Sequence, residues 1–102
     1  MNKLELIKNI MLEHRGKANK ITSREISFII GISEDDTHAT TRKLILESAT
    51  QYNLPLVADS GGYYLISDEI EYDKYMNNLD KRISGIEERK KIITKNFKEQ
   101  NE

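Results

Sequence analysis

The 102-residue chain contains no cysteine, no tryptophan and a single proline. Without cysteine it has no disulfide bond, no thiol nucleophile and no cysteine-ligated zinc or iron–sulfur site. It also lacks any apolar run near the roughly 18 to 20 residues of a membrane span, and its first residues lack the apolar stretch of a secretory signal. We therefore expect a soluble, cytoplasmic protein with no membrane contact. The length suits one compact domain plus one extended element.

The residue patterns of an enzyme are also missing. His14 and His38 are the only histidines, and neither has a second histidine or a carboxylate at a metal-ligand spacing such as H-E-x-x-H. Gly61-Gly62 belongs to a turn and not to a phosphate-binding loop. Glu87 and Glu88 are adjacent on a predicted helix, so they point in different directions and cannot act as a pair. The sequence predicts no catalytic activity, metal, cofactor or small-molecule substrate.

Charge is balanced overall but unevenly distributed. The chain has 16 basic and 17 acidic residues and a net charge of −1, which gives no general attraction to a polyanion. Residues 81–98, however, contain seven basic residues against two acidic ones, and an earlier cluster comprises Arg15, Lys17, Lys20 and Arg24. The later cluster either contacts DNA or forms the solvated face of a helix.

Two helices are expected in the first third of the chain. Asn2 is a cap for a helix over residues 3–14, because apolar residues then recur at helical spacing. A polar loop with Gly16 follows. Thr22 opens a second capping box, and the short helix after it is expected to end at Gly31, where glycine can adopt the left-handed conformation that terminates helices.

A third helix is expected to begin directly after Ser33, with the acidic residues 34–36 in its first turn. Helical spacing then separates an inner and an outer face. The inner face carries Thr37, Thr41, Leu44, Ile45, Ser48 and Tyr52. The outer face carries Asp36, Ala39, Thr40 and Lys43, with Arg42 at the border.

A hairpin and a long helix complete the chain. Pro55 ends the third helix, and two short apolar runs, Leu54 to Ala58 and Tyr63 to Ser67, flank a glycine turn, which predicts a β-hairpin. From Ser67 to about Lys98 only Gly85 weakens a continuous helix. Steps of 4 and 3 residues alternate along a heptad seam formed by Tyr72, Met76, Leu79, Ile83, Ile86, Lys90, Ile93 and Phe97. We expect a mainly α fold with a small β-hairpin (α+β), organised as a domain over 1–67 and a dimerisation helix over 68–102.

Two stretches resemble the winged helix-turn-helix family. Residues 21–33 (ITSREISFIIGIS) resemble its first helix and turn, and residues 53–65 (NLPLVADSGGYYL) resemble its wing. The chain is similar over about residues 4–67 to small winged-helix proteins of bacteriophages and mobile elements, several of which carry a long helix after the wing. The resemblance implies a DNA-binding transcription regulator or replication accessory factor, with double-stranded DNA as its partner.

The resemblance also implies which residues face DNA. A protruding third helix fits the major groove while the wing rests on the neighbouring backbone. The implied groove-facing set is Asp36, Thr37, Thr40 and Lys43, flanked by Arg42. Ser23 and Arg24, where the second helix exposes backbone amides, are candidate phosphate contacts, as are Lys17 and Lys20 in the loop. Acidic residues 34–36 and a wing tip without basic residues predict weak non-specific binding.

Alternatives remain for each of these features. Ser23 and Arg24 belong equally to an ordinary capping box, and Lys17 and Lys20 to a solvated loop. The fold can present the same surface to a replication or transcription protein instead of DNA. The heptad seam favours a homodimer that presents two recognition helices to a palindromic site, with Lys90 fixing register or chain number. The alternative is that the long helix folds back on its own domain.

Overall fold

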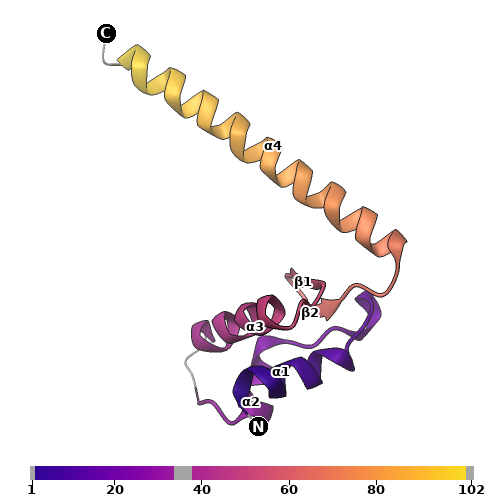
Figure 1. The fold of residues 1–102 in the computed structure, drawn as a ribbon. Helices are drawn as coiled ribbons and strands as arrows, with labels where there is room; N and C mark the ends of the chain where they lie inside the picture. The colour runs from indigo at the N-terminus through magenta and orange to yellow at the C-terminus, as the bar shows by residue number, and fades with distance from the viewer. Residues whose placement is uncertain (1, 34–37, 101–102) are drawn as a thin grey trace. The chain divides into compact units, whose positions relative to one another are not determined.

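The computed structural model describes residues 2–33 and 38–100. Its elements in chain order are α1 (Lys3–Leu12), a 3-10 helix η1 (Lys17–Asn19), α2 (Ser23–Ile30), α3 (Ala39–Gln51), β1 (Leu56–Asp59), β2 (Gly62–Leu65) and α4 (Glu69–Gln100) (Figure 1). The predicted mainly helical fold with a two-stranded antiparallel sheet and a long C-terminal helix is confirmed. The chain divides into one unit over Met1–Glu71 and a second over Tyr72–Glu102.

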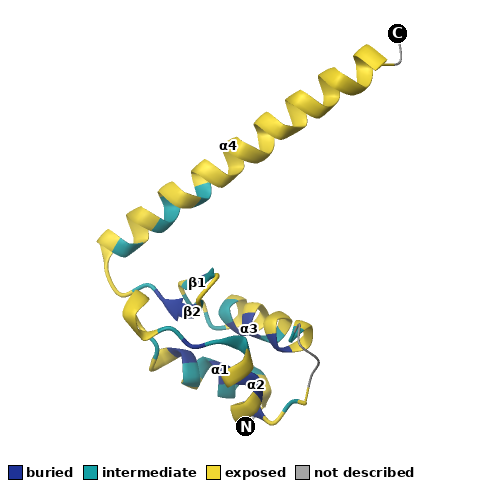
Figure 2. Ribbon diagram, turned by 180° about the vertical axis from the view of Figure 1, so that it is seen from behind, coloured by how far each residue is buried: buried dark blue, intermediate teal, exposed yellow. Residues whose placement is uncertain are grey.

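The core of the first unit lies where α1, α2, α3 and β2 meet (Figure 2). Buried side chains come from every one of these elements and from the segment before α2: Ile7, Met11, Ile21, Ile26, Ile30, Ile45, Tyr63 and Leu65. Each buried side chain of this size contributes about 1.5–3 kcal/mol relative to its exposed state. A polar contact also joins two helices, because the buried Ser48 hydroxyl donates to the Leu4 carbonyl at 2.7 Å.

The first two helices begin as the sequence predicts. The Asn2 side chain accepts a hydrogen bond from the Glu5 amide at 2.8 Å, and Thr22 with Glu25 forms the full capping box of α2. Gly31 has φ 76°, the left-handed conformation expected at the end of α2. The helix α1 ends at Leu12, before the predicted residue 14, because the next amides bond three residues back and tighten the last turn.

The start of α3 differs from the prediction. The helix begins at Ala39 and not directly after Ser33, because its N-cap, His38, adopts the left-handed conformation with φ 50°, which interrupts a right-handed helix. Glu34, Asp35, Asp36 and Thr37 lie outside the described residues. The two faces of the described helix are as expected. Thr41, Ile45 and Ser48 are buried, and Thr40, Arg42 and Lys43 are exposed.

The hairpin is shorter than predicted, and the residue before the α2 cap pairs with its other edge. Leu56 pairs with Leu65 and Asp59 with Gly62, which leaves Ser60 and Gly61 at the turn. On the other edge of β2, the backbone of Ile21 exchanges two hydrogen bonds with Tyr63, at 2.9 and 2.7 Å. This pairing fixes the start of α2 beside the hairpin.

The long helix α4 runs without a break from Glu69 to Gln100. Its residues before Tyr72 belong to the first unit, where the Glu71 carboxylate accepts hydrogen bonds from the Ser67 and Lys17 amides, both at 2.9 Å. From residue 80 to 100 every residue is exposed (Figure 2). None of the helices in the described ranges combines the length and apolar character needed to cross a membrane.

Candidate nucleic-acid interface

A cleft on the first unit brings together three elements that are distant in sequence. We call it the α2–hairpin cleft. It is lined by the first turn of α2, one side chain of α3 and the hairpin turn: Thr22, Ser23, Arg42, Asp59, Ser60, Gly61, Gly62 and Tyr63. The pairing of Ile21 with Tyr63 creates it, because this pairing sets the α2 N-terminus next to the turn. The cleft therefore gathers a guanidinium group, hydroxyls and the positive end of a helix dipole.

The polar groups at this α2 N-terminus are partly used by the cap. The Glu25 amide donates to the Thr22 hydroxyl at 3.1 Å, and the Glu25 carboxylate accepts from the Thr22 amide at 3.2 Å. The hydrogen bond from the Thr22 backbone is the main reason why the pKa of Glu25 lies below its ordinary value. The amides of Ser23 and Arg24 precede the capped amide of Glu25, in the turn where helices expose donors to anions.

Lys20, in the segment before α2, forms an ion pair with the hairpin. Its ammonium lies 2.9 Å from the Asp59 carboxylate and 6.0 Å from the centre of the Tyr64 ring. Burial raises the pKa of Asp59, but hydrogen bonds from Lys20 and the Gly61 amide outweigh it, so the pKa lies below its ordinary value. Lys20 thus holds the loop before α2 to the turn. A phosphate contact by Lys20 would have to compete with this ion pair.

The other predicted contact residues are spread over the surface. Lys43 and Thr40 are exposed on α3, and Lys43 lines a separate depression with Leu4, Leu46, Glu47, Thr50 and Gln51. Arg24 lines a third depression with Glu25, Phe28 and Ile29. Lys17 is exposed on η1 and donates its amide to Glu71. The structure therefore brings Ser23 and Arg42 together and places Lys43 and Arg24 apart from them.

Sequence reasoning missed two features of this surface. Ser60 and Tyr63 line the cleft, but no local pattern links them to Arg42, because only the folded Ile21–Tyr63 pairing does so. Phe28 is 87% exposed, and Ile29 is 52% exposed beside it. The sequence did indicate these exposed side chains. Three consecutive apolar residues, Phe28-Ile29-Ile30, point in different directions on a helix, so they cannot all belong to the one buried face of α2.

Comparisons with protein-family models, curated proteins and solved structures found no match. The functional evidence therefore lies in the chemistry of the surface residues. The α2–hairpin cleft offers one guanidinium, the Ser23 hydroxyl and helix-terminal amides, which suit a phosphate oxygen, whereas the Thr22 hydroxyl donates to the Glu25 carboxylate at 2.9 Å. The negative charge of Asp59 in the same cleft repels an anion, so we expect this surface alone to bind phosphate groups with modest affinity.

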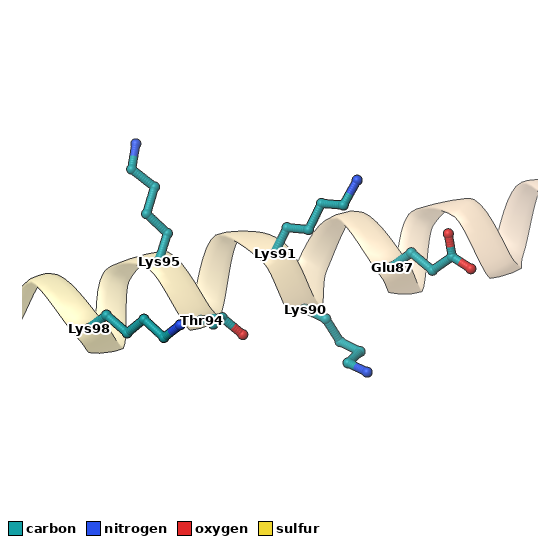
Figure 3. A pocket seen from close by; sticks show the side chains of 6 residues that line it. All are labelled: Glu87, Lys90, Lys91, Thr94, Lys95 and Lys98. Carbon is teal, nitrogen blue, oxygen red and sulfur yellow. The ribbon is translucent and has the colours of Figure 1, made fainter.

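The second unit offers a different surface. Its heptad seam is open to solvent beyond Leu79: Ile83 is 53% exposed, Ile86 56%, Ile93 59% and Phe97 67%. Beside the seam, an open depression along α4 is lined by Glu87, Lys90, Lys91, Thr94, Lys95 and Lys98 (Figure 3). Figure 3 shows Lys91 and Lys95 extending on one side of the helix and Lys90 on the other. Lys90, which the heptad spacing places at a seam position, thus extends away from Lys91 and Lys95.

Proposed function

We propose that this chain is a winged-helix protein that binds double-stranded DNA in the cytoplasm as a homodimer. Its role would be that of a transcription regulator or replication accessory factor of the phage or mobile-element type. The observation that carries the proposal is the α2–hairpin cleft, where Arg42 of α3 and Ser23 of α2 meet the hairpin turn. The element order supports it: a helix, a segment paired with the hairpin, two helices and the hairpin itself.

In this proposal the exposed face of α3 lies in the major groove. Thr40 and Lys43 on that face are suited to a thymine methyl and to guanine or phosphate, respectively. Arg42 and Ser23 contact the phosphate backbone at the edge of the groove, beside the hairpin turn. Because the net charge is −1, few phosphates are neutralised, and non-specific affinity is expected to be low.

Equilibrium binding to duplex DNA at two or more salt concentrations tests the proposal. We expect affinity to fall steeply with salt, and Arg42→Ala to weaken binding about tenfold and reduce the salt slope by about one. Lys3→Ala is the matched control, since it removes one positive charge at the exposed start of α1 and should leave binding unchanged. Binding that ignores both salt and Arg42→Ala would overturn the proposal.

A second candidate function rests on Phe28. An aromatic side chain that is 87% exposed, next to a half-exposed isoleucine, is typical of a protein-binding surface. In that case the chain is an interaction module for a replication or transcription protein. Phe28→Ser would then abolish binding to that purified protein, whereas Arg42→Ala would not, and the chain would show no salt-dependent binding to DNA.

A further inference from the structure

Charged residues of opposite sign lie on the two flanks of the α4 seam. In heptad terms, Met76, Ile83, Lys90 and Phe97 occupy position a, and Tyr72, Leu79, Ile86 and Ile93 occupy position d. The flank that follows d, position e, carries three exposed acidic residues, Asp73, Asp80 and Glu87, and then the neutral Thr94. The flank that precedes a, position g, carries Arg82 and Arg89 between the neutral Tyr75 and Asn96. Up to residue 89, one edge of the seam is therefore acidic, and the other edge carries two arginines.

This arrangement distinguishes the two ways in which two such helices can pair. In a parallel coiled coil, a residue at g lies across from the residue at e five positions later in the partner. Arg82 then faces Glu87 of the second copy, and this pair forms twice by symmetry. In an antiparallel coil, e faces e and g faces g, so acidic residues meet acidic ones and arginines meet arginines.

We infer that α4 pairs with α4 of a second copy of this chain as a parallel, in-register, two-stranded coiled coil whose orientation is selected by Arg82 and Glu87. This inference rests on the proposed homodimer and specifies its geometry. The apolar side chains that fill the interface are those left open on the helix, from Ile83 to Phe97. No residue of the first unit is needed for it.

Lys90 adds a second argument for two strands in register. It stands at an a position, between Ile83 and Phe97, and it extends away from Lys91 and Lys95 (Figure 3). In a two-stranded coil the long side chain can bring its ammonium to the edge of the interface, whereas three or more strands bury it more deeply. A shifted register would place Lys90 against an apolar layer, at the cost of desolvating its charge.

Engineered disulfide bonds measure the orientation, because the chain has no native cysteine. Ile93→Cys at a d position should cross-link the two copies on oxidation, since equivalent d residues are adjacent in a parallel coil. In an antiparallel coil over the same seam, the two cysteines are roughly 25 Å apart, by the helical rise of 1.5 Å per residue. Lys91→Cys, which points outward in either arrangement, is the control and should not cross-link.

Charge reversal tests the two selecting residues. Arg82→Glu alone and Glu87→Arg alone each place like charges across a parallel interface, so each variant should self-associate about tenfold more weakly than the original chain. An equimolar mixture of the two variants should recover the original affinity as a heterodimer, because every facing pair is then opposite in charge. Self-association of Arg82→Glu as tight as the original, or a mixture no tighter than its components, would overturn the inference.

Light scattering on the unmodified chain gives the number of copies in the assembly, so it distinguishes a failure of the proposed homodimer from a failure of the parallel orientation. A dimeric mass without the Ile93→Cys cross-link means that dimerisation stands and the parallel orientation is wrong. A monomeric mass rejects both the homodimer and this inference, and a trimeric or tetrameric mass rejects the two-stranded arrangement. DNA binding by the first unit is measured independently of all three outcomes.

Discussion

At the scale of single residues, Gly62 is the position where the fold depends most directly on the absence of a side chain. Its φ is 133°, and a Cβ there would lie 2.6 Å from the carbonyl oxygen of Ile21. That carbonyl accepts the Tyr63 amide, so it cannot move away without breaking the pairing that builds the α2–hairpin cleft. The geometry of the candidate interface therefore depends on glycine at position 62.

Gly62→Ala should lower the free energy of unfolding by roughly 2–4 kcal/mol, because the added methyl meets backbone and the conformation is strained for alanine. Chemical denaturation followed by circular dichroism gives this value. Gly61→Ala is the control, since its Cβ would meet side-chain atoms and no backbone, at 3.1 and 3.3 Å for Lys20 and 3.4 Å for Asp59, and a change below about 1 kcal/mol is expected. Equal effects of the two substitutions would contradict this account of Gly62.

Glu71 is a second single-residue feature, and it makes stability depend on pH. Hydrogen bonds from the backbone amides of Ser67 and Lys17 lower the pKa of Glu71 below its ordinary value of 4.5. A carboxyl with a lower pKa in the folded than in the unfolded chain stabilises the fold above the unfolded pKa. This stabilisation is lost as the pH falls from 4.5 through the lower folded value.

Glu71→Gln should therefore be less stable than the original chain at neutral pH, and the difference should shrink as the pH falls below 4.5. Unfolding free energies measured across this acid range check the expectation. Glu69→Gln removes the same charge at an exposed neighbouring position of α4 and serves as the control. A difference between Glu71→Gln and the original chain that stays constant with pH would contradict the role given to the carboxylate.

At the scale of elements, the packing of α1 against α3 includes one buried polar contact. Ser48 is fully buried, and its hydroxyl donates to the carbonyl of Leu4 in the first turn of α1. Ser48→Ala removes this buried hydrogen bond between α3 and α1 and should cost about 1–1.5 kcal/mol of stability. Thr50→Ala removes an exposed hydroxyl that bonds within α3 and should cost only about 0.5 kcal/mol. Thermal or chemical denaturation of both variants distinguishes the two.

Elements set by local chemistry were predictable from the sequence. The capping box of Thr22, the left-handed Gly31 and the helical spacing of α4 each involve residues a few positions apart, and the structure confirms all three elements. The start of α3 was wrong, because acidic residues after Ser33 resemble a first helical turn, whereas His38 interrupts the right-handed conformation. Local propensity gave no sign of that interruption.

Long-range contacts account for what the sequence could not provide. The pairing of Ile21 with Tyr63 spans forty-two positions, and it sets the start of α2 beside the hairpin turn, where Ser23 and Arg42 line one cleft. Lys43, the next residue on α3, points in another direction and lines a separate depression. Lys20 was predicted as a phosphate contact because it is a lysine in the loop before the second helix. Its ion pair with Asp59 follows from the same pairing, which brings the loop to the hairpin turn.

At the scale of the whole molecule, each of the two units has its own proposed function, which is DNA binding for the first and dimerisation for the second. The first unit has its own buried core and carries the α2–hairpin cleft, whereas α4 beyond residue 80 is exposed throughout. If α4 pairs two copies, each DNA site contacts two first units at once. The second contact is then intramolecular, and its effective concentration raises the affinity without any new contact to DNA.

Ile86→Lys should separate this dimer into monomers, because it replaces an apolar seam residue in each chain and places two like charges in the interface. The first unit should unfold as before, since Ile86 lies outside it. On DNA carrying two half-sites, the variant should bind no more tightly than to a single half-site, while the original chain should gain at least about tenfold. Ser84→Lys introduces the same charge at an outer position of α4 and should remain dimeric by light scattering. A monomeric Ile86→Lys that keeps the full two-site affinity would show that dimerisation through α4 is not part of DNA binding.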